Sequence, residues 1–138
     1  RIPTLKEWEL AAYTEFRPNN RDGYKFKKSY PYPTGENTLG LNCLNDCNFH
    51  YPSKYSKFLL RGYGHVSTTL TKKGINGLYD MGGNVWEWVD INDNSYKGTK
   101  GGSWWYGKNQ MIQGYNATKP KNMSAVYIGF RCVKDFKN

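Results

Sequence analysis

A loop-forming segment, residues 16–55, constrains the fold more than any other feature of the chain. Pro, Gly, Asn and Asp recur throughout it, with dense clusters at residues 17–20 and 30–35. These residue types favour turns over helices and strands, and a loop segment this long is uncommon in a compact domain. We therefore expect sparse regular structure. The segment is either a lid over a site or a set of loops that aromatic side chains and bound ions fix in place.

The core must be built largely from aromatic rings. Five Trp, twelve Tyr and six Phe make up 17% of the 138 residues, and all hydrophobic residues together make up only 38%. A chain of this length usually forms one domain. The shortage of aliphatic residues excludes a leucine-rich helical bundle, the absence of a long apolar run excludes a membrane span, and the ring content argues against disorder.

The charge of the chain says little about its partners. Twenty Lys and Arg residues against eleven Asp and Glu residues give a formal net charge of +9. The lysines occur singly or in short groups, and none of these groups lies beside an aromatic motif of the kind that stacks on RNA bases. We interpret the excess as a solvated basic surface and predict no nucleic-acid partner.

One helix and three strands can be predicted. Thr4 and Glu7 have the spacing of a capping box, which predicts a helix over about residues 5–14 with Leu5, Trp8 and Ala12 on one face. Alternation predicts a strand at residues 85–89, with both of its Trp residues on one face. Two further strands are expected at residues 100–105 and 125–133.

The last of these strands sets the expected core face. Val126, Ile128, Phe130 and Cys132 alternate along it, and we expect them to face the core. One short helix, several strands and long loops predict an α+β fold with a small antiparallel sheet.

Residues 77–88 carry the most informative chemistry. Asp80 and Glu87 flank a Gly-Gly turn, in which carbonyl groups are exposed and carboxylates can converge on a hard cation. The arrangement indicates a calcium-like site. An alternative of equal weight is a tight turn between aromatic residues, with Glu87 paired to a Lys or Arg.

Five motifs in order resemble the formylglycine-generating, or sulfatase-modifying-factor, family. The resemblance spans nearly the whole chain but starts partway into the family's domain, so residues 1–138 are expected to be a single domain that lacks its N-terminal part. It implies a C-type-lectin-like fold with a small twisted antiparallel sheet, few helices and long loops. The motifs are Arg1-Ile2-Pro3-Thr4 with Glu7-Trp8-Glu9, Gly77-Leu78-Tyr79-Asp80-Met81, Gly83-Asn84-Val85-Trp86-Glu87-Trp88, Gly101-Gly102-Ser103-Trp104 and Gly129-Phe130-Arg131-Cys132.

The resemblance implies a calcium site formed by the side chains of Asp80 and Glu87 and the carbonyls of Gly83 and Val85. A second family calcium site would involve Asn42, Cys43 and an acidic residue where this chain has Arg61. Because a guanidinium repels a cation, we expect the second site to be empty, with Arg61 acting as an internal counter-charge.

The resemblance also bears on catalysis. Oxidase members bind copper(I) through two cysteines, and those positions correspond here to Tyr106 and Met111. Related sulfoxide synthases hold a non-haem iron through histidines of an upstream domain, and this chain has only His50 and His65. We therefore favour a non-catalytic domain over an oxidoreductase module that works with upstream residues.

The cysteines allow two interpretations. Cys43, Cys47 and His50 could begin a zinc site completed by Asp46, His65 or Cys132, although their spacing departs from the usual zinc knuckle. Buried thiols or a local disulfide fit the spacing better. The family position that would pair with Cys132 is occupied here by Ala12, so we expect Cys132 to be a buried free thiol.

Residues 104–116 form the best candidate for a binding face, because they are rich in rings and amides and almost uncharged. Trp104 is expected in the core. A related set of lectin-fold proteins, diversified by retroelements, carries its variable residues in this stretch. The predicted ligand-binding residues are Trp105, Tyr106, Asn109, Gln110 and Asn116.

The function expected from the sequence is a calcium-stabilised binding or scaffolding domain that recognises a protein or glycan through this face. The compartment stays open, with an extracytoplasmic location slightly preferred.

Overall fold

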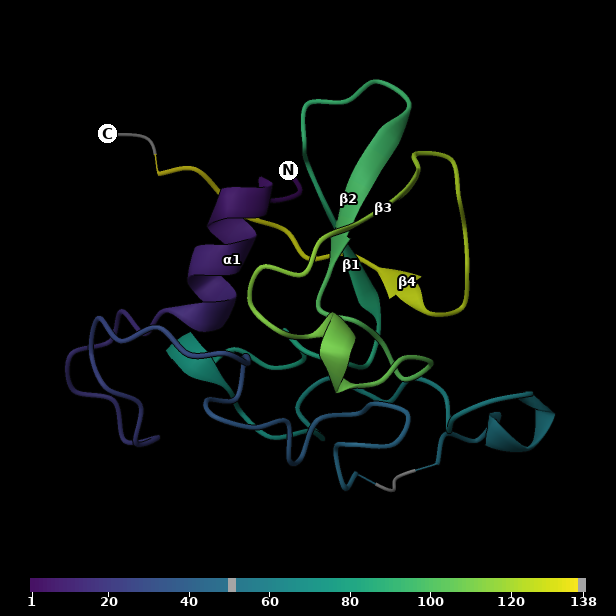
Figure 1. The fold of residues 1–138 in the computed structure, drawn as a ribbon, viewed down its shortest axis with the longest axis horizontal. Coiled ribbons are helices and arrows are strands. Elements are labelled where there is room, and N and C mark those ends of the chain that lie inside the picture. Colours follow the sequence, from purple (N-terminus) through teal and green to yellow (C-terminus); the bar gives the residue numbers. More distant parts are fainter. Residues whose placement is uncertain (50–51, 137–138) are drawn as a thin grey trace.

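The computed structural model describes residues 1–49 and 52–136. One helix and one sheet form the regular part of the molecule, and the loops of residues 14–49 and 52–84 gather at one end of the sheet (Figure 1). Three single-turn 3₁₀ helices interrupt the loops. The elements are α1 (Leu5–Tyr13), β1 (Trp86–Val89), β2 (Tyr96–Lys100), β3 (Ala117–Pro120), β4 (Ile128–Gly129) and the 3₁₀ turns Ser56–Phe58, Ile75–Gly77 and Lys108–Gln110.

The helix begins where its sequence predicts. Thr4 accepts a hydrogen bond from the Glu7 amide, and the Glu7 carboxylate accepts one from the Thr4 amide, which completes the capping box. The buried side chains of α1 pack against the sheet and the turn that precedes it. This core consists of Trp8, Ala12, Tyr13, Met81 and Val89.

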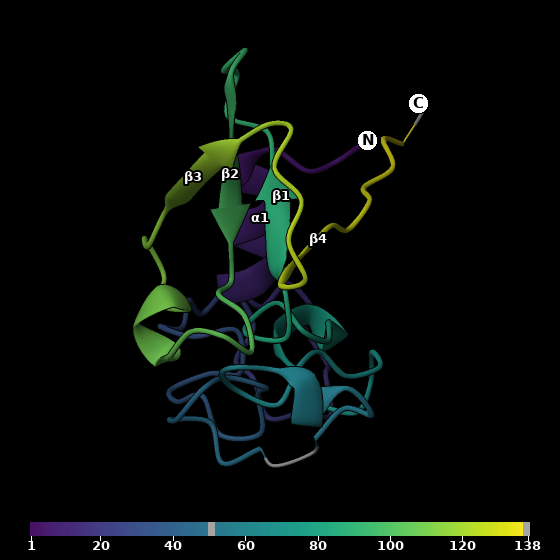
Figure 2. The same ribbon diagram turned by 90° about the vertical axis from the view of Figure 1, so that its right-hand side faces the viewer.

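The sheet has the strand order β3-β2-β1-β4. β1–β2 and β2–β3 are antiparallel, whereas the two-residue strand β4 runs parallel to β1. Figure 2 shows α1 behind β1 and β2, on one face of the sheet. Since side chains alternate along a strand, Val89 faces the helix and the two Trp residues of β1 face the other way, as predicted.

The strand predicted at residues 100–105 does not form. The observed strand β2 ends at Lys100, the residue at which the predicted strand was expected to begin. Gly101 and Gly102 follow with φ of 90° and 69°. A Cβ atom at Gly101 would lie 2.5 Å from the Met81 carbonyl oxygen, so only glycine allows this approach. β3 pairs with β2 but was not predicted.

The expected core face of residues 125–133 was wrong. Val126 is 65% exposed, Phe130 is 68% exposed and Cys132 is exposed. Only Ile128 and Gly129 pair with β1, so alternation does not persist along the segment. Arg131 was not among the residues expected to face the core, but its side chain forms an ion pair with the buried Glu87.

Aromatic side chains and polar networks fix the long loop. The rings of Tyr24 and Tyr30 pack edge to face, and Tyr30 is buried. The Glu15 carboxylate, fully buried, accepts hydrogen bonds from Arg17 and the Asn76 amide. In the described part of the chain, no helix has the length and apolar character needed to cross a membrane.

Candidate functional site

Asp80 lies in the turn before β1 with an unsatisfied carboxylate oxygen. Its backbone is in the left-handed region, with φ of 58°. Oδ1 accepts a hydrogen bond of 2.6 Å from the Thr71 hydroxyl, whereas Oδ2 is buried and has no hydrogen-bond partner among the described residues. Burial raises the pKa of Asp80 above its ordinary value, and the charge of Glu87 adds to the effect.

Glu87, the second predicted ligand, is held by a cation of the protein itself. Arg131 donates to Oε2 over 2.6 Å and to Oε1 over 2.7 Å, and the Trp8 indole donates to Oε2 over 2.7 Å. The pairing of Glu87 with an arginine, one part of the alternative interpretation, is therefore present. A carboxylate has about four lone-pair sites, so one site on Oε1 is left for a further partner.

The backbone between the two carboxylates is tightly fixed. Gly83 has φ of 72°, and a Cβ atom there would lie 2.4 Å from the Asn42 carbonyl oxygen. The Gly83 amide donates to the Gly101 carbonyl over 2.7 Å. All four predicted ligand positions therefore lie close together in the chain: Asp80, Gly83 and Val85 in the segment before β1, and Glu87 near the beginning of β1. An oxygen of Asp80 that lacks a partner fits a hard cation.

The positions of the second family site form an amide network. The Asn42 side chain donates to the Gly64 carbonyl and to Asn84 Oδ1, and the Asn84 side chain donates to the Val66 carbonyl. Arg61 is exposed, so the prediction that it acts as an internal counter-charge was wrong. Its charge acts on Tyr106 instead.

The two nearby cysteines form a disulfide. Cys43 and Cys47 are bonded and buried beside Met111, which confirms the local disulfide and leaves no thiolate there for zinc. His50 lies outside the described residues. Within residues 1–49 and 52–136, no three His, Cys, Asp or Glu side chains gather as a metal site. Cys132 is free but exposed, so the expected burial was wrong.

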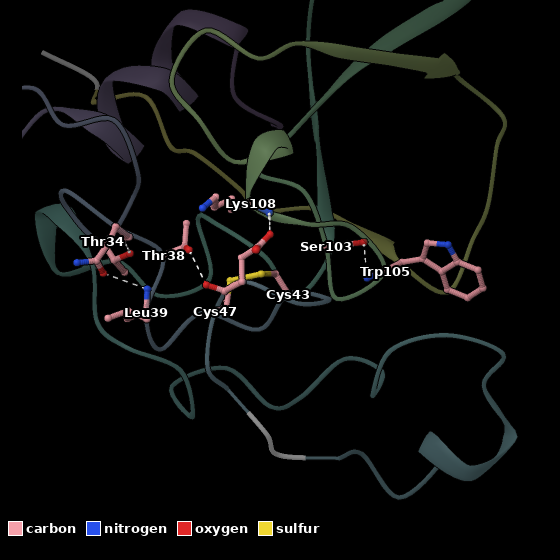
Figure 3. Close-up of a disulfide and its surroundings, with 10 residues drawn as sticks. Thr34, Thr38, Leu39, Cys43, Cys47, Ser103, Trp105 and Lys108 are labelled. Carbon is pink, nitrogen blue, oxygen red and sulfur yellow. Dashed lines mark hydrogen bonds between the residues drawn. A yellow bond between two sulfur atoms is a disulfide. The ribbon is translucent and has the colours of Figure 1, made fainter.

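The disulfide loop supports the start of the predicted binding face. The Leu44 amide donates to the Tyr106 carbonyl over 3.0 Å, and the Lys108 amide donates to Asp46 Oδ2 over 3.3 Å. Figure 3 shows the disulfide below Lys108, with the Trp105 side chain pointing away from it. The loop therefore positions the backbone that carries Trp105 and Tyr106, whose side chains are half-buried.

Five rings pack together in one cluster, which we call the aromatic face. Trp86 is its buried centre, Tyr115 is exposed, and Trp105, Tyr106 and Tyr127 are half-buried. Tyr106 is central, with ring centroids 5.3 Å from Trp86 and 5.8 Å from Tyr127. Trp105 lies 5.8 Å from Tyr127, and Tyr115 lies 6.3 Å from Trp86. Trp86 belongs to the sheet face opposite α1, so this cluster covers the side of the sheet that the helix leaves open.

The face unites some of the predicted residues and omits others. Trp105 and Tyr106 belong to it, while Asn109 is exposed and Gln110 is half-buried on the adjacent 3₁₀ turn. Trp104 is buried, as predicted. Prediction from residues 104–116 missed Trp86 and Tyr127, which come from β1 and the segment before β4. The alternation of Trp86 and Trp88 was the only sequence signal for this extension.

Asn116, an exposed residue, belongs to the hydrogen-bond network of the buried Lys100. The ammonium group of Lys100, whose side chain is 1% exposed, donates to Glu9, to the Tyr115 carbonyl and to Asn116 Oδ1. It also lies 5.6 Å from the Trp8 ring centroid. Burial lowers the pKa of Lys100. Lys100 therefore ties the end of the predicted binding loop to α1.

The positions implied for copper have other contacts here. Tyr106 is part of the aromatic face, and Met111 is fully buried against the disulfide. A phenol and a thioether do not offer the paired thiolates that copper(I) prefers.

Structural comparison finds the same fold in two solved proteins. The structure titled "Crystal Structure of CarF" has a TM-score of 0.61 and 22% sequence identity, and Treponema denticola variable protein 1 has a TM-score of 0.57 and 21% identity. Each alignment covers 94% of this chain and 45% of the other, so the chain spans less than half the length of these neighbours.

Sequence comparison gives the family. No curated protein matches the chain. The model of the FGE-sulfatase family, described as the sulfatase-modifying factor enzyme 1-like domain, matches residues 1–136. Together with the helix, the four-stranded sheet and the motif turn around Asp80, this match establishes that the chain belongs to the sulfatase-modifying factor enzyme 1-like family.

Proposed function

We propose that this domain is a non-catalytic binding module that recognises a protein or glycan through the aromatic face and is stabilised by calcium at Asp80. The observation that carries the proposal is the connected set of rings on the sheet side opposite α1. Trp and Tyr provide large contact areas with few rotatable bonds, so little conformational entropy is lost when a partner binds. Tyr106 and Met111 occupy the positions at which oxidase members have the two cysteines that bind copper.

Removing rings from the face is expected to abolish binding. Peptides selected from a displayed random library, or sugars identified on a glycan array, serve as probes. Trp105→Ala and Tyr106→Ala should each weaken binding of the selected probes by tenfold or more, because truncated interface aromatics typically cost about 2 kcal/mol or more. Titration calorimetry measures the change.

A matched control is available on the far loops. Phe58 is 73% exposed on the 3₁₀ turn Ser56–Phe58 and is outside the aromatic face. Phe58→Ala should leave the same probes bound with unchanged affinity. Probes that bind Trp105→Ala and Tyr106→Ala as tightly as the wild type would refute the role of the face.

The support for calcium is the buried Asp80 oxygen that lacks a partner. A cation bound there would be coordinated by Asp80 Oδ2, by the remaining lone pair of Glu87 and by carbonyl oxygens of the turn. These are the oxygen ligands that calcium prefers. The ion would compensate the carboxylate charge that burial disfavours. Calcium therefore should act on stability and leave the aromatic face free for the partner.

Asp80→Asn distinguishes the calcium-bound from the calcium-free domain by the sign of its effect. With calcium present, the variant should melt several degrees lower than the wild type, because the charged ligand is lost. With a chelator, it should melt at the same temperature or higher, because the wild type then buries an uncompensated charge. Differential scanning calorimetry with calcium or EDTA measures both.

The pH dependence gives an independent check in the chelated protein. Asp80 has a higher pKa in the folded state than in the unfolded state, so its protonated form favours folding. The melting difference between Asp80→Asn and wild type should shrink as the pH falls below the raised folded pKa towards the ordinary aspartate value. An unchanged difference, or a wild-type melting temperature indifferent to EDTA, contradicts the calcium assignment.

A further inference from the structure

The aromatic face carries an unpaired positive charge. Lys119, on β3, places its ammonium group 5.2 Å from the Trp86 ring centroid. Its side chain has no ion-pair partner among residues 1–49 and 52–136. Arg61, whose charge acts on the Tyr106 hydroxyl, also has no ion-pair partner in the same residues. Two cations without an ion pair therefore lie near these rings.

The sheet provides no carboxylate to neutralise Lys119. Lys97 of β2 stands directly opposite Lys119, and like charges in this position repel each other. Asp90 pairs with Lys97 at 2.7 Å. Asp90 therefore neutralises Lys97, and Lys119 forms no ion pair with it.

The carboxylate of the disulfide loop is held by another group: Asp46 Oδ2 accepts a hydrogen bond from the Lys108 amide over 3.3 Å. A positive charge that the fold leaves uncompensated beside the rings of the aromatic face is complementary to an anionic partner.

Two polar groups under the rings also lack partners. The indole N–H of Trp86 and the hydroxyl of Thr99 are buried, and neither has a hydrogen-bond partner in the described residues. Thr99 pairs with Trp88, so its side chain lies on the same sheet face as Trp86. Because both groups are buried, they lie beneath the surface that a partner would contact.

We propose that the aromatic face docks an acidic segment of a partner protein, with a carboxylate at Lys119 and apolar atoms against Tyr106 and Tyr115. This inference rests on the proposed function. It chooses a protein partner over a glycan, because Trp, Tyr and Arg are the residues that contribute most to binding at protein interfaces. The electrostatic part makes binding depend on salt, because the attraction between exposed charges decays over a Debye length of about 10 Å at 0.1 M and over a shorter length at higher salt.

The test uses peptides selected on the wild-type domain from a displayed random library. We expect these peptides to be enriched in Asp and Glu and to bind more weakly as salt rises. Lys119→Glu should reduce their affinity by tenfold or more, and selection on that variant should favour Lys and Arg. Lys119→Gln should give an intermediate loss. Both variants should fold, because each removes the repulsion from Lys97.

The control is a second lysine above a ring. Lys57 lies 5.0 Å from the Phe58 ring centroid and, like Lys119, has no ion-pair partner in the described residues. Lys57→Glu should leave peptide affinity and selection unchanged.

Each result separates this inference from the proposed function. Selected peptides that are neutral or basic, or acidic peptides that bind Lys119→Glu unchanged, overturn the acidic-segment inference while a binding face persists. If sugars bind the face and peptides do not, the acidic-segment inference is also overturned, whereas the proposed function stands. If the library and the glycan array yield no probe that depends on Trp105 or Tyr106, both proposals fail.

Discussion

Glu87→Ala is expected to destabilise the domain by about 3 to 5 kcal/mol, the usual cost of removing one partner of a buried ion pair. The Glu87 side chain is 7% exposed and holds both Arg131 and the Trp8 indole. Without it, the Arg131 guanidinium loses its carboxylate and the Trp8 N–H loses its acceptor. Trp8 belongs to the core against α1, so the loss reaches the centre of the fold.

Urea unfolding followed by Trp fluorescence measures this change. A double-mutant cycle of Glu87→Met, Arg131→Met and the double variant shows how much comes from the pair itself. Each single variant leaves one charge without its partner, whereas the double variant removes both charges. We expect the double variant to be more stable than either single variant. Single-variant losses that simply add in the double variant would show that the pair is not coupled.

The same variant bears on calcium. Glu87→Ala should also abolish the dependence of the melting temperature on calcium, because it removes a predicted ligand. Glu87→Ala alone cannot separate the two roles of Glu87, since both lower stability. The sign reversal expected for Asp80→Asn separates them, because Asp80 Oδ2 has no protein partner to lose.

Local patterns predicted the parts of the fold that depend on adjacent residues. The capping box of Thr4 and Glu7 fixed the start of α1, and the alternation around Trp86 fixed β1. β3 escaped prediction because its residues pair with β2 through backbone hydrogen bonds and carry no alternating apolar pattern. Phe130 was placed in the core because a nine-residue strand was assumed where only two residues pair.

The candidate site shows the same division. Asp80 and Glu87 were identified from one contiguous motif, but the partner of Glu87 lies 44 residues away at Arg131. Trp86 and Tyr127 join Tyr106 only because β1 and β4 are neighbours in the sheet. Lys119 could not be identified from the sequence, because its position opposite Lys97 and above Trp86 depends on the strand register. Tertiary pairing of this kind leaves no signal at fixed spacing in a single sequence.

Lys100→Met is the second change with a large expected effect. It removes an ammonium group that donates to Glu9, the Tyr115 carbonyl and Asn116, all from a side chain 1% exposed. Hydrogen bonds to a charged group contribute about 1.5 to 3 kcal/mol each. Tyr115 and Asn116 are exposed residues and the Glu9 side chain is 31% exposed, so water takes over part of the lost interactions. We expect a total loss of about 2 kcal/mol.

The loss should be localised as well as global. Because Lys100 ties residues 115 and 116 to α1, hydrogen exchange in residues 104–116 should accelerate more than exchange in β1, and peptides selected on the aromatic face should bind more weakly. Lys97→Met, on the same strand, is the control: its pair with Asp90 lies near the surface, where such pairs contribute about 0 to 1 kcal/mol. Equal losses for the two variants, or unchanged exchange in residues 104–116 of Lys100→Met, would show that Lys100 does not position the binding loop.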